Sequence, residues 1–422
     1  MGMDKDADSL LDTYAELALV EGVNLQPGQR LQIGTATEIF RTPLESAPLV
    51  RKIAQKAYRM GASLVEVYWG DDQLKPIRLT HAAKETLEEY PSWIAGEIEN
   101  EIHRGDASLC IWGEDPYLLD GIDPERITIV QQTKYKILEK LYELDAQNPR
   151  NWSGIMYPVP AWAEAVFPDL SRQEAVAKVW DYIVQFCRLE KPDPLAYWKS
   201  HNDDLDNRAQ WLTQANFKRL HLKSPETDLK MDIPKGHIWF GGRSKLPSGL
   251  EFCPNLPTEE VCTLPHRTGV NGHVLATKPF SYMGMNVEGM RLEFEDGLVV
   301  QATAEKGEEQ LKTILDLDEG SRRLGEVALV PHSTPISQSQ ILFHHGLLDE
   351  NASVHLAFGS AYRFNLTDGE KMDNETFMAA GGNFSKIHLD FMIGSADMDV
   401  DGIKENGDVE PLLKAGEWAF KP

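Results

Sequence analysis

A change of pattern near residue 220 constrains the fold of this chain more than any other feature. Before it, strand-like runs alternate with helical patterns, which indicates an open α/β sheet. The strand-like runs are residues 30–35, 62–69, 107–113 and 152–157, and the helical ones are 48–60, 124–146 and two more within 170–220. We therefore expect an α/β domain over residues 1–220.

Beyond residue 220 the chain consists mainly of short strand candidates separated by turn signals. Residues 290–304 alternate apolar and polar side chains around Asp296-Gly297, which predicts a β-hairpin. This pattern predicts a β-rich α+β domain over residues 221–422. The expected fold class is α/β plus α+β, with an N-terminal open α/β sheet domain followed by a β-rich domain.

Charge and cysteine content exclude several classes of protein. The formal net charge is −24 over 422 residues, which disfavours nucleic acid and anionic membrane surfaces as partners, since both bind clustered Lys and Arg. The four cysteines are widely spaced and form no CxxC pair, which argues against a disulfide framework or a thiolate zinc site. The acidic N-terminal segment does not resemble a secretory signal. We expect a cytoplasmic setting.

The common catalytic and nucleotide-binding motifs do not occur in the sequence. It contains no HExxH, no GxxxxGK[ST], no GxSxG and no GxGxxG that follows a strand. The α/β half therefore carries no recognisable nucleotide site, and a structural or oligomer-forming role is its default interpretation. A nucleotide-binding module there remains an alternative without a phosphate loop to support it.

Carboxylates and imidazoles inside apolar segments are the strongest chemical signal, because a buried charge is expensive unless it is paired or bound to metal. Glu259 and Glu260 lie between a proline turn and an apolar strand. If that stretch is extended they face opposite ways, so only one need be a ligand. Glu326 opens a strongly apolar strand. Each could instead be a solvated surface residue.

Two further segments carry the imidazoles. His355 follows Glu350 among apolar neighbours, where a core histidine bonded to a backbone carbonyl is the plainer interpretation. His388 and Asp390 are two residues apart in a predicted strand, so they share one face and make a good chelating pair for Zn, Co or Mn. The remaining histidines, which include His266, His332, His344 and His345, are interpreted as loop or supporting residues.

A single hypothesis accounts for these segments together: a pair of divalent cations held by about six oxygen and nitrogen ligands. The set has four carboxylates and two imidazoles: Glu260, Glu326, Glu350, His355, His388 and Asp390. Because it contains no thiolate, it fits a catalytic site better than a structural zinc site. The predicted reaction class is metal-assisted hydrolysis.

Four motifs in order resemble the thermophilic aminopeptidase family of the aminopeptidase T and aminopeptidase S type. They are NLPTEEVCTLPHRTGVNGHVLATKP, RRLGEVALVPHSTPIS, LLDENASVHLAFGSAY and GGNFSKIHLDFMIGS. The resemblance implies metal ligands at Glu260, Glu326, Glu350, His355, His388 and Asp390, and an active-site tyrosine at Tyr362. It also implies a catalytic C-terminal domain and a homodimer that encloses the active-site cavity.

The sequence therefore predicts a dinuclear metallo-aminopeptidase acting on peptides with free N-termini. Two divalent ions are expected, Zn or Co ahead of Mn or Mg, with Glu326 or Asp390 as the bridge. Tyr362 is expected to stabilise the oxyanion, and Glu259 is a candidate proton shuttle. The alternatives are another dinuclear metallohydrolase, such as a dipeptidase or amidase, and a non-enzymatic protein with a structural metal site.

Overall fold

The computed structural model describes residues 5–37, 41–145, 149–282 and 285–422, which form two compact units. The first unit holds the described residues up to Ser200 together with Arg243–Pro257. The second holds His201–Gly242 and Thr258–Pro422. The first unit thus takes in a stretch from beyond residue 220. The separate roles expected for the two halves of the chain stay predictions.

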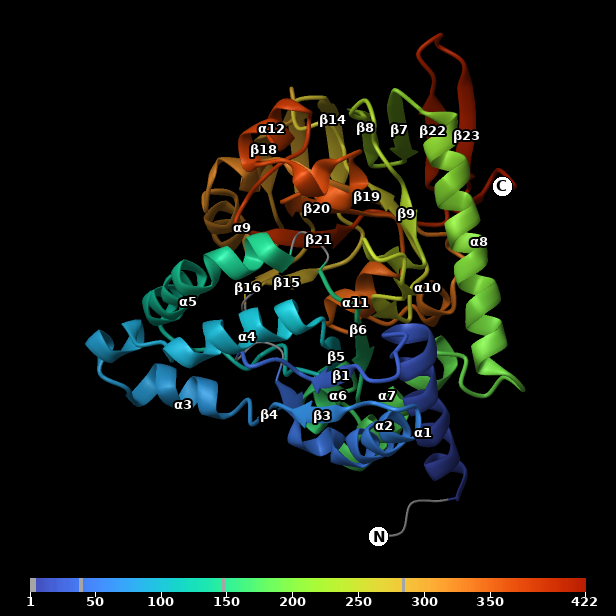
Figure 1. The fold of residues 1–422 in the computed structure, drawn as a ribbon. Coiled ribbons are helices and arrows are strands. Elements are labelled where there is room, and N and C mark those ends of the chain that lie inside the picture. The colour runs from blue at the N-terminus through green and yellow to red at the C-terminus, as the bar shows by residue number, and fades with distance from the viewer. Residues whose placement is uncertain (1–4, 38–40, 146–148, 283–284) are drawn as a thin grey trace. The chain divides into compact units, whose positions relative to one another are not determined.

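A five-stranded parallel sheet forms the centre of the first unit, in the order β12-β6-β5-β1-β3. Figure 1 labels β6, β5, β1 and β3 of this sheet. Its strands are β1 (Arg30–Ile33), β3 (Leu64–Val67), β5 (Ala107–Trp112), β6 (Trp152–Met156) and β12 (Asn255–Leu256). Its longer helices are α1 (Lys5–Leu17), α2 (Ala47–Arg59), α3 (Leu74–His81), α4 (Ser92–Arg104), α5 (Pro124–Asp145), α6 (Pro160–Val166) and α7 (Arg172–Phe186). Helix α8 (Pro194–Ala215) begins in this unit and continues into the second. The expected open α/β sheet is confirmed.

Local sequence explains where these helices begin and end. Helix α2 has a proline in its first turn, buries Ile53 and Ala57, and is followed by Gly61 with a φ of +96°. Helix α7 begins with a capping box in which the Ser171 side chain and Glu174 satisfy each other's backbone N–H groups. The predicted helical patterns therefore become helices at nearly their predicted bounds.

Two large antiparallel sheets form most of the second unit (Figure 1). The five-stranded sheet has the order β21-β20-β19-β13-β9, and the eight-stranded sheet has the order β18-β17-β14-β8-β7-β22-β23-β24. The strands of the first are β9 (Phe240–Gly241), β13 (Val261–Thr263), β19 (Leu324–Leu329), β20 (His355–Gly359) and β21 (His388–Met392). Those of the second are β7 (Arg219–Ser224), β8 (Thr227–Asp232), β14 (Val270–Leu275), β17 (Arg291–Glu295), β18 (Leu298–Thr303), β22 (Asp399–Ile403), β23 (Val409–Lys414) and β24 (Glu417–Trp418). Its short helices include α9 (Glu308–Leu315), α10 (Pro335–Ser339), α11 (Gly346–Glu350) and α12 (Asn374–Ala379).

One apolar core joins the two sheets of the second unit. It contains Val327 and Phe358 from the five-stranded sheet and Leu229 and Val400 from the eight-stranded sheet, all at most 1% exposed. The predicted hairpin is confirmed: β17 and β18 pair across Asp296-Gly297, and both turn residues have positive φ. The β-rich α+β character of this half of the chain is therefore confirmed.

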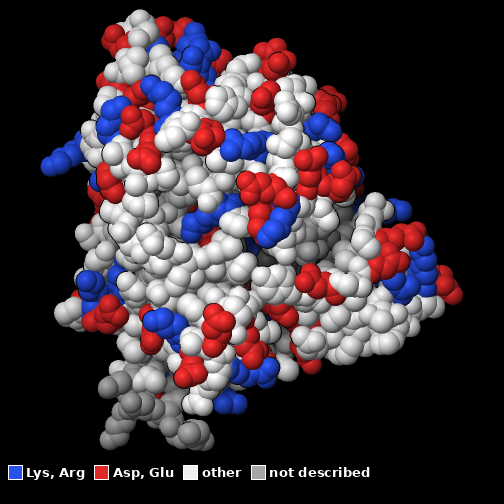
Figure 2. Space-filling model, turned by 180° about the vertical axis from the view of Figure 1, so that it is seen from behind, with Lys and Arg blue, Asp and Glu red and all other residues white. Residues whose placement is uncertain are grey.

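The surface mixes charges of both signs, as Figure 2 shows for the face it presents. Within the described ranges, no helix is long and apolar enough to cross a lipid bilayer.

Candidate metal centre

The five-stranded sheet of the second unit has one apolar face and one face that carries polar groups. Alternate residues Val327, Leu356 and Phe358 belong to the core cluster. The strand register places Glu326, Ala357 and Asp390 in one row across β19, β20 and β21, so these three share the opposite face. Because Ala357 is small, the row leaves room between its two carboxylates.

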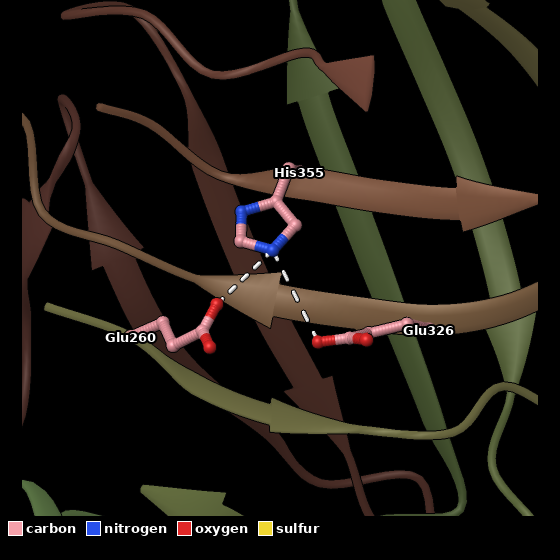
Figure 3. A group of neighbouring side chains, drawn as sticks. All are labelled: Glu260, Glu326 and His355. Atoms are coloured by element: carbon pink, nitrogen blue, oxygen red, sulfur yellow. Dashed lines mark ion pairs between the residues drawn. The ribbon is translucent and has the colours of Figure 1, made fainter. Parts of the chain in front are cut away.

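Glu260, Glu326 and His355 form the first group of close ligand atoms (Figure 3). His355 Nε2 lies 3.1 Å from Glu260 Oε2 and 4.0 Å from Glu326 Oε1. All three residues are at least nine-tenths buried. They come from β20, β19 and the residue that precedes β13, so three neighbouring strands bring them together.

Glu326, His388 and Asp390 form a second group. His388 Nε2 lies 3.1 Å from Glu326 Oε2 and 3.5 Å from Asp390 Oδ1. The shared strand face predicted for His388 and Asp390 is therefore confirmed. Glu326 belongs to both groups, and its two oxygens approach different imidazoles.

Backbone carbonyls orient both imidazoles. His355 Nδ1 lies 3.1 Å from the Ser353 carbonyl oxygen, and His388 Nδ1 lies 2.7 Å from that of Ser360. A carbonyl only accepts, so each Nδ1 carries the proton and donates it. Each Nε2 thereby faces the carboxylates and is the ring nitrogen available to a metal ion, which is the usual arrangement of metal-binding histidines.

The buried charges of this cluster fit a divalent cation. Glu260 Oε2 is buried and has no hydrogen-bond partner among the described residues, despite its distance of 3.1 Å from His355 Nε2. Burial raises the pKa of Glu260. Burial alone would lower the pKa of His355, yet the interaction with the Glu260 carboxylate 3.1 Å away outweighs it and raises the pKa to about 10. These directions describe an excess of negative charge, which divalent cations bound to these oxygens and nitrogens would offset.

Cys262 lies on the same sheet face, since it pairs with Ala328, which in turn pairs with His355. Burial, and then the charges of Glu326 and Glu260, raise the pKa of its thiol well above the usual range. Cys262 belongs to neither group of close ligand atoms, which contain only carboxylates and imidazoles.

Glu350 and Tyr362 belong to neither group of close ligand atoms. Glu350 ends helix α11, and burial followed by the charges of Glu260 and Asp390 raises its pKa. The Tyr362 ring lies 4.5 Å from the His388 ring between centroids and is 41% exposed. Partial burial, and then the charge of Glu326, raise the pKa of Tyr362 above its usual range, so the hydroxyl stays a donor.

Glu259 is also outside both groups, and its surroundings contain two residues for which the sequence predicted no role. Its Oε2 lies 3.5 Å from His201 Nε2, and its backbone N–H donates to Asn351 Oδ1 at 2.6 Å. His201 lies within the helical pattern of residues 170–220, where nothing in the sequence marks it as a site residue. For Asn351, the sequence feature that could have indicated a role is its position next to Glu350. The four histidines interpreted as loop or supporting residues join neither group.

This arrangement defines a class of protein. Buried carboxylates and oriented imidazoles on one face of an antiparallel sheet, with no thiolate among them, are the kind of ligand set that metal-dependent hydrolases use.

Comparison with known proteins identifies the family. The model of the thermophilic metalloprotease (M29) family matches residues 7–418. Aminopeptidase 2 of Geobacillus stearothermophilus is 44% identical, and aminopeptidase T of Thermus thermophilus is 43% identical; each alignment covers 97% of this chain and 98% of the relative. The structure of wild-type AmpT from Thermus thermophilus matches with a TM-score of 0.89 and 41% identity over 97% of this chain and 99% of that chain. The chain belongs to the M29 family, and it is therefore a peptidase, a hydrolase of peptide bonds.

Proposed function

We propose that this chain is a dinuclear metallo-aminopeptidase that removes the N-terminal residue from peptides. The observation that carries the proposal is Glu326, whose two oxygens belong to two different ligand groups. A carboxylate that bridges two ions is typical of two-metal hydrolases.

The ligand roles follow from the two groups. Glu260 and His355 would hold one ion, His388 and Asp390 the other, and Glu326 both. Glu350 is the sixth ligand in the proposal, supported by the effect of Glu260 and Asp390 on its pKa. Four carboxylates and two dications balance in charge, which relieves the repulsion among these buried groups. Zn or Co fits such a set, and Mn or Mg are the alternatives.

The chain's own residues have separate tasks in the reaction. Bound divalent ions supply Lewis acidity, which activates water and polarises the scissile carbonyl. Tyr362 keeps its proton and donates a hydrogen bond to the oxygen on which negative charge develops. Glu259, adjacent to the ligand Glu260, is the candidate that carries a proton to the leaving amine.

Exopeptidase specificity is proposed from the relatives' names and from the charge of the site. The relatives of this chain are named aminopeptidases. A protonated or metal-binding α-amino group is recognised by acidic or metal sites, whereas an acetylated one is not. Peptides with free N-termini should therefore be cleaved one residue at a time, and N-acetylated peptides should resist. Cleavage of both at equal rates would favour an amidase, and cleavage of dipeptides alone a dipeptidase.

Chelation tests the metal dependence. Dialysis against a strong chelator should abolish hydrolysis of an amino-acid anilide, and Zn²⁺ or Co²⁺ should restore it. Full activity in protein shown by elemental analysis to lack divalent ions would refute the proposal. Metal binding without turnover of any peptide in a broad panel would indicate a structural metal site instead.

We also propose a cytoplasmic setting and a homodimer. The four cysteines are buried, which is compatible with a reducing compartment. The dimer rests on the family resemblance, and light scattering of the purified protein would test it.

A further inference from the structure

Thr258, Glu259 and Glu260 lie in none of the strands, although they supply a proposed ligand. They precede β13 and are at most 8% exposed. Buried backbone N–H and C=O groups outside a sheet ladder need other partners. Side chains from two distant parts of the second unit provide them.

Asn351, which is fully buried, is the first partner. Its Oδ1 accepts the Glu259 backbone N–H at 2.6 Å, and its Nδ2 donates to the Leu347 carbonyl at 2.8 Å. Nδ2 also lies 3.4 Å from Glu350 Oε1. The orientation of the amide is determined, because the N–H needs an acceptor while the carbonyl and the carboxylate need donors. One carboxamide thus connects the Glu259–Glu260 segment to the end of α11.

His201, on helix α8, is the second partner. Its Nε2 lies 2.8 Å from the Thr258 carbonyl oxygen and 3.5 Å from Glu259 Oε2. Since a carbonyl accepts only, Nε2 carries the proton and donates. The backbone of Thr258 and Glu259 is therefore held from both sides: its C=O by His201 and its N–H by Asn351.

We propose that His201 and Asn351 are positioning residues that fix this backbone so that Glu259 and Glu260 point to different surroundings. Glu260 is directed to His355 and Glu326, while Glu259 is directed to His201. Asn351 also orients Glu350 through the contact between its Nδ2 and Glu350 Oε1. Partners that orient metal ligands in this way typically change metal affinity or activity 10- to 100-fold when removed. The inference rests on the proposed function, because Glu260 and Glu350 matter as metal ligands.

The test compares metal affinity in matched variants of the full-length protein. Asn351→Ala and His201→Ala should each weaken Zn²⁺ binding about 10- to 100-fold, measured by competition with a chromophoric chelator. The Zn²⁺ concentration for half-maximal activity should rise by the same factor. His201→Gln can still donate to the Thr258 carbonyl and should recover most of the affinity.

Asn151→Ala is the control for a purely structural loss. Asn151 is a fully buried asparagine of the first unit and accepts a hydrogen bond from Gln29 Nε2 at 2.7 Å. The Asn151→Ala variant should have a lower melting temperature, as Asn351→Ala should, but an unchanged metal affinity. If Asn351→Ala fails to fold, the two His201 variants decide the question alone.

The outcomes separate this inference from the proposed function. Wild-type Zn²⁺ affinity in Asn351→Ala and His201→Ala would overturn the positioning role while the aminopeptidase proposal stands. Equal losses in His201→Gln and His201→Ala would overturn the assignment of His201 as a backbone donor. A wild-type protein that binds no divalent ion would refute the proposed function, and this inference with it.

Discussion

Glu326→Gln should damage metal binding more than any other single ligand substitution. Glu326 belongs to both ligand groups, whereas Glu260 belongs to one and Asp390 to the other. Glutamine keeps the size of the side chain and removes one negative charge. The variant should therefore fold normally and lose affinity for both ions.

The magnitude follows from the geometry. Glu326 Oε1 lies 4.0 Å from His355 Nε2, the partner with which it would hold an ion. One unit-charge attraction at that separation is about 4 kcal/mol for an effective dielectric constant of 20. At about 1.4 kcal/mol per decade, affinity should fall roughly a thousandfold. A cation held by both atoms would lie closer to each of them, so the thousandfold loss of affinity is a lower bound.

Competition titration with a chromophoric chelator measures this affinity, and elemental analysis measures the number of bound ions. Glu260→Gln and Asp390→Asn should each weaken the binding of one ion and leave the binding of the other unchanged. Glu226→Gln, at an exposed ion pair with Arg291, is the control and should bind metal as the wild type does. Two ions bound by Glu326→Gln with wild-type affinity would refute the shared-carboxylate reasoning.

Three further predictions follow. Ala357→Val should crowd the ligand face, reduce the number of bound metal ions and lower the free energy of unfolding by about 1–3 kcal/mol. Leu356→Ala, on the core face, should lower it by about 2–5 kcal/mol in chemical denaturation yet keep both ions. Burial lowers the pKa of His237 below 6.5, so the fold favours the neutral imidazole. Its contribution to stability is therefore complete above pH 6.5 and is lost as the pH falls through the lowered pKa. The His237→Gln variant should show a smaller fall of melting temperature on acidification. Gly359→Ala, at φ +92° and with its new Cβ 2.1 Å from the Ile387 carbonyl oxygen, should lower the free energy of unfolding by at least about 1–3 kcal/mol in urea titration.

Much of the fold was predictable because its signals are local. The β17–β18 hairpin follows from alternation around Asp296-Gly297, and helix α2 follows from its apolar spacing and Gly61. The return of Arg243–Pro257 to the first unit was not predictable. Strand β12 has two residues, too few for a periodic pattern, and its partner β6 lies about a hundred residues earlier in the chain.

The site divides in the same way. His388 and Asp390 could be placed on one face from their spacing alone, because strand geometry fixes which residues share a face. That Glu326 lies between two imidazoles depends on the register of β19 against β20 and of β20 against β21. Register is set by cross-strand pairing and by the core beneath, and neither is visible in a single segment.

The sequence by itself determined which residue types were available for chemistry: carboxylates and imidazoles within apolar strands, where burial makes an uncompensated charge expensive. It also determined, through four ordered motifs, the family resemblance that the comparisons confirm. The motifs already favoured Glu260 over Glu259 as the ligand. Only the tertiary structure showed that Glu260 lies beside His355 while Glu259 lies beside His201, and that His201 and Asn351 hold the segment between them. Adjacent residues of an extended chain differ little in sequence context, and it is their distant partners, brought close by folding, that separate them.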